Sequence, residues 1–229
     1  MKKSIVFVFT VLIFVLAAFS SVSAQNKMYV TLGQYEQDNN ISNGPEDIEW
    51  LVLAIRESNN EKWAFLVSKY VIDARPYNDT KTDVTWETSS IRKWLNSDFY
   101  NKAFSPSEKE QIIKFSIPNP DNPEYNTPGG NKTSDNVFLL SYEDVVRYFP
   151  EPSSRLCVGT PYANAKGDLH SNESGKITEN VKWATRTPGS KGYGVIFIES
   201  DHDGTFMMNG GAVDVIKGIR PVLNIKWNN

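Results

Sequence analysis

The 229-residue chain has little of what most catalytic and metal sites are built from, because it contains one cysteine, Cys157, and only two histidines. A single cysteine excludes an intrachain disulfide framework and a zinc site built from several thiolates. The sequence also lacks the spacings H-E-x-x-H, G-x-S-x-G and G-x-x-x-x-G-K-[ST] that mark metalloproteases, α/β-hydrolases and phosphate-binding loops. We therefore predict no catalytic residues, no resident metal and no cofactor.

The sequence also has no excess of basic residues over acidic ones. The chain has 24 Lys and Arg against 27 Asp and Glu, for a formal charge of −3. Because a protein that binds nucleic acid needs a basic face, we expect no nucleic-acid partner. Hydrophobic residues at 40% and aromatic residues at 12% are what a folded domain has and a disordered chain does not.

Residues 1–24 predict a secretory signal peptide. Lys2 and Lys3 precede a short apolar run, and Ala24 ends a stretch of small residues of the kind that signal peptidases recognise. Cleavage there leaves residues 25–229 as a single domain with a formal charge of about −5. No second apolar run follows, so we expect no membrane span after removal of the signal. The predicted localisation is export, either to the periplasm or to the extracellular medium.

Apolar patterning predicts strands at both ends of the domain with helices between them. Strands are expected at residues 28–35, 47–56, 62–68, 136–140, 181–185, 193–199, 205–208 and 219–225. The second and third form a hairpin with a loop of about four residues. Residues 119–133 are rich in Pro, Gly and Asn, which indicates a long surface loop.

Three helices are expected in the middle of the chain. An apolar stripe at Ile91, Trp94, Leu95 and Phe99 has helical spacing, with Thr85 as its cap. Two capping boxes begin the others: Ser105-Pro106-Ser107-Glu108, with Ile112 and Ile113 on the apolar face that follows, and Ser141 with Asp144, in a helix that reaches about Tyr148. The predicted fold class is therefore α+β, with two to three helices on short, mostly antiparallel sheets and long polar loops.

The turn Asp201-His202-Asp203-Gly204 has two interpretations. It resembles the start of a calcium-binding loop, but the twelfth position, where such a loop has Glu, is Ala212. A β-hairpin turn with Gly204 at positive φ is favoured, and calcium stays as the alternative.

Tryptophan and arginine are the residues that most favour a binding site. An exposed Trp stacks on a sugar ring, and Arg binds carboxylates through two hydrogen bonds. We predict a ligand site in the C-terminal loops, although these aromatic residues could instead fill the core. The predicted ligand-binding residues are Trp183, Arg186, Asp201, Asp203 and Asn209, and the predicted structural motif is Trp86, Arg92, Trp94 and Arg220.

Two motifs carry a resemblance to a known family. The run W-E-T-S-x-x-R-x-W-L-N from Trp86 to Asn96, and the terminal R-P-V-L from Arg220 to Leu223, are similar to those of an exported bacterial family of unknown function. The layout of that family resembles the C-type-lectin-like fold. The resemblance implies a secreted domain of that fold and no established activity.

Two functions remain open at this point. The first is a secreted, non-catalytic binding or interaction domain of a bacterial envelope or extracellular protein, with a glycan, a peptide or an envelope protein as partner. The alternative is a hydrolase, or a thiol-dependent enzyme using Cys157, acting on envelope polymers. Formylglycine-generating enzymes share the general fold and use cysteine near the C-terminus, but no cysteine follows Cys157 here.

Overall fold

The computed structural model describes residues 27–170, 180–200 and 203–227, so the predicted signal peptide and both Asp201 and His202 lie outside the described residues. The strands are β1 (Tyr29–Tyr35), β2 (Glu46–Ser58), β3 (Glu61–Ser68), β4 (Asp73–Arg75), β5 (Ile112–Ile113), β6 (Phe115–Ile117), β7 (Thr133–Asp135), β8 (Val137–Phe138), β9 (Trp183–Pro188), β10 (Gly194–Ile198), β11 (Phe206–Ala212), β12 (Lys217–Ile219) and β13 (Val222–Lys226). The helices are η1 (Trp86–Thr88), α1 (Ser90–Trp94), η2 (Leu95–Phe99), α2 (Tyr100–Ala103), α3 (Pro106–Lys109), α4 (Tyr142–Tyr148), α5 (Pro152–Arg155) and α6 (Pro161–Lys166).

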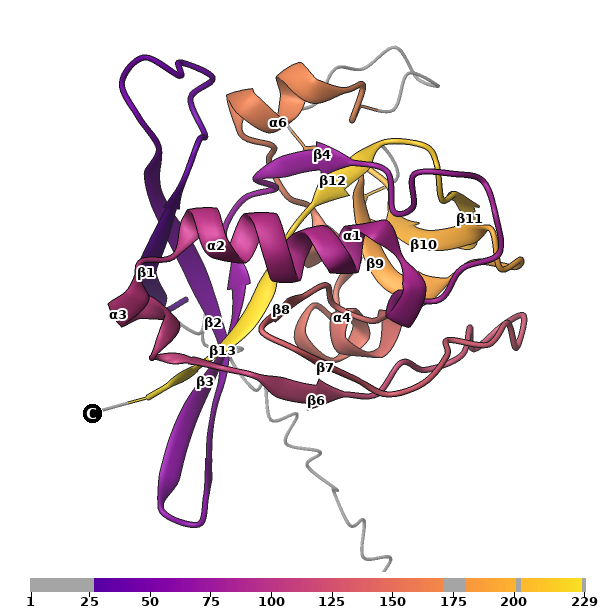
Figure 1. Cartoon of the computed structure of the whole chain (residues 1–229). Coiled ribbons are helices and arrows are strands. Elements are labelled where there is room, and N and C mark those ends of the chain that lie inside the picture. Colours follow the sequence, from indigo (N-terminus) through magenta and orange to yellow (C-terminus); the bar gives the residue numbers. More distant parts are fainter. Residues whose placement is uncertain (1–26, 171–179, 201–202, 228–229) are drawn as a thin grey trace, which may run out of the picture.

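Two main sheets organise these strands (Figure 1). The first has the order β1-β2-β3-β13-β5, with β8 also paired to β13. The second has the order β11-β10-β9-β12-β4, and β6 pairs with β7 in a small third sheet. Among the described pairings of named strands only β12 with β9 is parallel, and an isolated bridge between Val71 and Gly159 is parallel as well. The described residues thus form one mixed domain, rich in sheet with few helices, which confirms the expected α+β class.

The β2–β3 hairpin projects from the body of the molecule (Figure 1). Ser58 pairs with Glu61, so the turn contains two residues, Asn59 and Asn60, and not the four expected. Both have positive φ, at 52° and 63°. This left-handed pair matches the twist of the strands that it joins, and asparagine tolerates it better than other residues with a side chain.

The helical stripe predicted from Ile91 to Phe99 is confirmed. One continuous helical segment, α1 to α2 with the π-helical turn η2 between them, buries Ile91, Leu95 and Phe99. Thr85 precedes the short η1 turn, whereas the cap of α1 is Ser89, whose Oγ accepts a hydrogen bond from the Arg92 backbone N–H at 3.3 Å. In Figure 1 this segment extends from β1 towards β9.

Both predicted capping boxes are present, at Ser105 with Glu108 and at Ser141 with Asp144. The helix predicted through Ile112 and Ile113 is wrong, because α3 ends at Lys109 and these residues form β5. They pair with β13, and two β-branched residues favour that extended pairing over a further helical turn.

The predicted strand 219–225 is split into β12 and β13 at Arg220 and Pro221. Pro221 has no N–H to donate to a ladder, while its carbonyl oxygen accepts from the Ser68 N–H at 2.9 Å. The chain thereby leaves the second sheet and enters the first at this point. The helices α5 and α6, both with proline in the first turn, were not predicted.

The predicted hairpin between β10 and β11 is confirmed by their antiparallel pairing, and Gly204 has φ of 82°. None of the helices in the described part of the chain combines the length and apolarity needed to cross a membrane.

Candidate functional site

A cavity of about 290 Å³ opens between the first sheet, α4 and the segment that follows β5. We call it the aromatic pocket, because its walls include Trp63, Phe65, Phe115, Phe138 and Tyr148. The ring centroid of Phe65 lies 6.1 Å from that of Phe138 and 5.3 Å from that of Tyr148. Phe115 is 38% exposed, so the pocket presents an aromatic surface to solvent.

Strand register places one wall of this pocket. Trp63 lies directly opposite Arg56, and Phe65 lies directly opposite Asn224 on β13. Residues directly opposite each other share a face of a sheet, as do residues two apart in a strand. The alternation along β3 therefore brings these four side chains from three strands to the same face.

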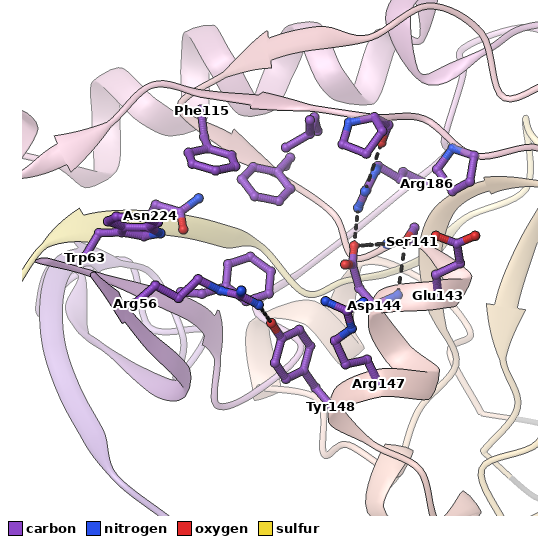
Figure 2. A pocket seen from close by; sticks show the side chains of 15 residues that line it. Arg56, Trp63, Phe115, Ser141, Glu143, Asp144, Arg147, Tyr148, Arg186 and Asn224 are labelled. Atoms are coloured by element: carbon purple, nitrogen blue, oxygen red, sulfur yellow. Dashed lines mark hydrogen bonds and ion pairs between the residues drawn. The ribbon is translucent and has the colours of Figure 1, made fainter. Parts of the chain in front are cut away.

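Helix α4 forms the opposite wall. Asp144, Arg147 and Tyr148 are spaced at i, i+3 and i+4, so they lie on one face of the helix. Figure 2 shows Arg56 reaching across to Tyr148, and its Nη2 donates to the Tyr148 hydroxyl at 2.7 Å. Within the described residues, neither Arg56 nor Arg147 forms an ion pair with a carboxylate. The rim thus carries two positive charges that have no ion-pair partner in the described part of the chain, and Glu143 also lines the pocket.

Arg186 lies in the wall of the same pocket and is 3% exposed. Its Nη1 donates to Asp144 Oδ2 at 2.7 Å (Figure 2). Nη1 also donates to the Leu139 carbonyl at 2.7 Å, and Nη2 donates to the Pro118 carbonyl at 3.1 Å. Burial alone raises the pKa of Asp144, but the Arg186 charge and hydrogen bonds from Ser141 outweigh it, so the pKa lies below its ordinary value. Arg186 and Asp144 therefore form a fixed pair that ties α4 to β9.

Among the described residues, Asn224 is one of two in the pocket with a buried side-chain nitrogen that lacks a hydrogen-bond partner, the other being Arg186 at Nε. Asn224 is 2% exposed, and its side-chain Nδ2 has no hydrogen-bond partner. Figure 2 shows the amide group on the Phe115 side of β13. A buried donor without a partner is costly and is rare in native proteins. An acceptor on a bound molecule would satisfy it.

The residues predicted as a ligand-binding set do not gather in one place. Trp183 has no exposed surface, and its indole Nε1 donates to the Arg155 carbonyl at 3.0 Å, so the protein itself covers the expected stacking face. Asp203 and Asn209 are exposed but do not line the aromatic pocket, and Asp201 lies outside the described residues. Of the four that the structure describes, only Arg186 lies at this pocket.

Two residues of the predicted structural motif, Trp86 and Arg92, are held by Asp135, which is 1% exposed. Its two carboxylate oxygens accept from Trp86 Nε1 at 2.9 Å and from Arg92 Nε at 2.7 Å. Trp94 packs against the guanidinium of Arg75, whose carbon lies 4.2 Å from the ring centroid. These contacts attach the helical segment to β7 and β4.

Three acidic side chains approach each other in the β1–β2 loop. One carboxylate oxygen from each of Glu36, Asp38 and Glu46 lies within 4.8 Å of the other two. Among the described residues, this is the group whose spacing could hold a metal ion. Backbone N–H groups of Gln37 and Asn40 already donate to them, so these carboxylates shape their own loop.

Comparison with models of protein families shows to which family the chain belongs. Residues 60–227 match the model of a domain of unknown function, DUF6273. The chain belongs to this family. The DUF6273 match contains every residue of the aromatic pocket named above except Arg56. No match was found among curated proteins or among solved structures.

Sequence reasoning missed most of the aromatic pocket. Trp63 and Phe65 look like ordinary residues of a buried strand, and Phe115 has no motif around it. The one available signal was Asn224, a polar residue between Leu223 and Ile225 in an otherwise apolar strand.

Proposed function

We propose that this DUF6273 protein is an exported, non-catalytic binding module of a bacterial envelope or extracellular protein, and that the aromatic pocket holds its ligand. The observation that carries the proposal is the buried, unpartnered Asn224 amide in a cavity with aromatic walls. Ligand pockets typically combine apolar walls with a few polar groups that fix orientation. Asn224 supplies such a group.

The chemistry of the rim narrows the ligand class. Aromatic faces at Trp63 and Phe115 suit the apolar face of a sugar or an apolar side chain. Arg56 and Arg147, which no described carboxylate pairs, suit a carboxylate. We therefore favour a glycan or peptide that carries a carboxylate, such as a peptidoglycan fragment.

The enzyme alternative has less support. Cys157 is 3% exposed, its Sγ lies 3.4 Å from the Lys69 carbonyl oxygen, and burial raises the pKa of its thiol, whereas a nucleophilic cysteine needs a low pKa. A glycosidase needs a carboxyl group of raised pKa as its acid. Asp144 has a lowered pKa and is fixed by Arg186.

The C-type-lectin-like resemblance forms part of the proposal. Its support is that the N-terminal strands β1 to β3 and the late strand β13 share one sheet, a helical segment packs beside it, and the last third of the chain forms a second sheet. An experimental structure whose two sheets superpose on C-type-lectin-like domains would support this assignment. A different strand connectivity would remove it.

Binding is tested by titrating the purified protein with peptidoglycan fragments, acidic oligosaccharides and their neutral counterparts, using calorimetry. We expect Trp63→Ala to weaken binding about tenfold, because it removes a stacking surface. Trp227→Ala is the matched control, since Trp227 is also half-buried and its backbone N–H bonds to the Lys62 carbonyl beside Trp63. Equal losses in both variants, or no binding by the unchanged protein, would contradict the proposal.

Export is tested separately by expressing the full chain and sequencing the N-terminus of the protein recovered outside the cytoplasm. We expect the mature chain to begin at Gln25, because cleavage follows Ala24. An intact N-terminus on protein retained in the cytoplasm would overturn this part of the proposal.

A further inference from the structure

Arg220 lies where the chain passes from β12 to β13, and it is a buried cation without a carboxylate partner. It is 5% exposed, and its Nε donates to the Ser68 carbonyl at 3.0 Å. Its Nη1 is buried and has no hydrogen-bond partner. No carboxylate among the described residues lies within ion-pair distance of it.

Aromatic rings hold this guanidinium in place. Its central carbon lies 5.1 Å from the ring centroid of Phe149 and 5.3 Å from that of Trp183. Such cation–π contacts offset part of the hydration free energy that the charge loses on burial, but they leave the Nη1 donors without an acceptor. A buried charge with unused donors is unfavourable unless an opposite charge approaches it.

A second cavity, of about 170 Å³, opens at this arginine. We call it the cationic pocket, because Arg220, Lys27 and Lys69 all line it and none of the lining residues that the structure describes is acidic. Lys69 Nζ bonds to Glu49 Oε2 at 2.6 Å and lies 4.9 Å from the ring centroid of Tyr70, another lining residue. Three cations therefore surround a small space in a chain whose overall charge is negative.

The size of the cationic pocket limits what it holds. Sites for drug-sized molecules have volumes of roughly 300–1,000 Å³. A cavity of 170 Å³ suits a single small group instead. The planar guanidinium of an arginine presents several N–H donors, and a nearby lysine ammonium adds more. Together they can donate hydrogen bonds to the oxygens of one phosphate group.

We propose that the cationic pocket is an anion site that binds one phosphate group, with Arg220 as the buried anchor and Lys69 as the second cation. The phosphate is either the free ion or the end of a phosphate ester. This site is separate from the aromatic pocket and does not depend on the function proposed there.

The test is calorimetric titration of the purified full-length protein with inorganic phosphate and with glycerol 3-phosphate, at constant ionic strength so that screening does not change. We expect both probes to bind. Tighter binding of glycerol 3-phosphate identifies an ester as the ligand, and equal binding identifies the free ion. Failure of both probes to bind would overturn the proposal.

Variants locate the site. Arg220→Met keeps an unbranched apolar side chain between the rings and removes the charged donors, so we expect phosphate affinity to fall at least tenfold. Lys69→Gln should weaken binding about fivefold. Lys81→Gln is the matched control, because Lys81 is an exposed lysine whose Nζ lies 5.4 Å from the Tyr193 ring centroid, away from the pocket. We expect it to bind like the unchanged protein.

Circular dichroism of each variant separates loss of binding from loss of fold. If Arg220→Met does not fold, Lys69→Gln against Lys81→Gln still decides the question. Unchanged phosphate affinity in Lys69→Gln, or an equal loss in Lys81→Gln, would refute the site whether or not the aromatic pocket binds a ligand.

Discussion

The surroundings of Arg186 and Arg220 show two different ways of burying a guanidinium. Arg186 has a carboxylate, Asp144, and two backbone carbonyls as acceptors. Arg220 has one carbonyl acceptor and two aromatic rings. Each arginine has one buried nitrogen without a hydrogen-bond partner, Nε in Arg186 and Nη1 in Arg220. Arg186 is nevertheless a structural cross-link between β9 and α4, whereas Arg220 has no carboxylate partner among the described residues. Burial alone therefore does not distinguish a structural arginine from one available to a ligand, but the count of its partners does.

Of the substitutions considered, the loss of Arg186 should lower the stability of the fold most. We expect Arg186→Met to lower the free energy of unfolding by about 2–3 kcal/mol, because the half-buried Asp144 and the carbonyls of Leu139 and Pro118 then lose their donor. Urea denaturation followed by fluorescence measures this change. The control is Arg147→Met, at an exposed position on α4, the helix that carries Asp144. It should change the free energy of unfolding by less than about 0.5 kcal/mol. Similar losses in both variants would contradict the cross-link.

Lowering the pH should also reduce the free energy of unfolding through Asp144, by less than the Arg186→Met substitution does. The pKa of Asp144 is lower in the folded protein than in the unfolded chain. Its contribution to stability is therefore complete above the unfolded value of about 4, and is lost as pH falls through the folded value. Urea denaturation between pH 6 and pH 2.5 should show a steeper decline for the unchanged protein than for Asp144→Asn. Parallel pH profiles would show that this pair does not control acid stability.

Removing Arg220 should have the smallest effect on stability. In phosphate-free buffer we expect Arg220→Met to change the free energy of unfolding by about 1 kcal/mol or less, because no carboxylate is left without a partner and a buried charge is removed. The same denaturation experiment gives this value beside that of Arg186→Met. A loss as large as that of Arg186→Met would mean that Arg220 is also a structural cross-link.

The parts of the fold predicted from sequence are those with local signals. The capping boxes at Ser105 and Ser141 and the positive φ of Gly204 depend on neighbours within four residues. The stripe from Ile91 to Phe99 depends on one helical period. Each of these predictions was confirmed because no distant part of the chain had to be known.

The parts that were not predicted depend on partners far along the chain. Ile112 and Ile113 form a strand because β13 lies beside them, more than 100 residues later in the sequence. Trp183 was expected to stack on a ligand, but its indole N–H has a carbonyl partner at Arg155. The aromatic pocket takes its lining from β2, β3, β6, β8, β9, β13 and α4, which are far apart in the sequence. The register of β3 with β2 and β13 places one wall, and no local pattern predicts it.

Strand β13 also has a consequence for the order in which the protein forms. It pairs with β3, β5 and β8, all of which are synthesised before it. Until residues 222–226 have left the ribosome, these three strands lack their common neighbour and the first sheet cannot close. Such non-local pairing makes folding slow relative to a chain of local contacts. The part of the first sheet that contains β5 and β8 thus forms only after nearly all of that sheet's residues have been made, whereas β1, β2 and β3 pair with one another independently of β13.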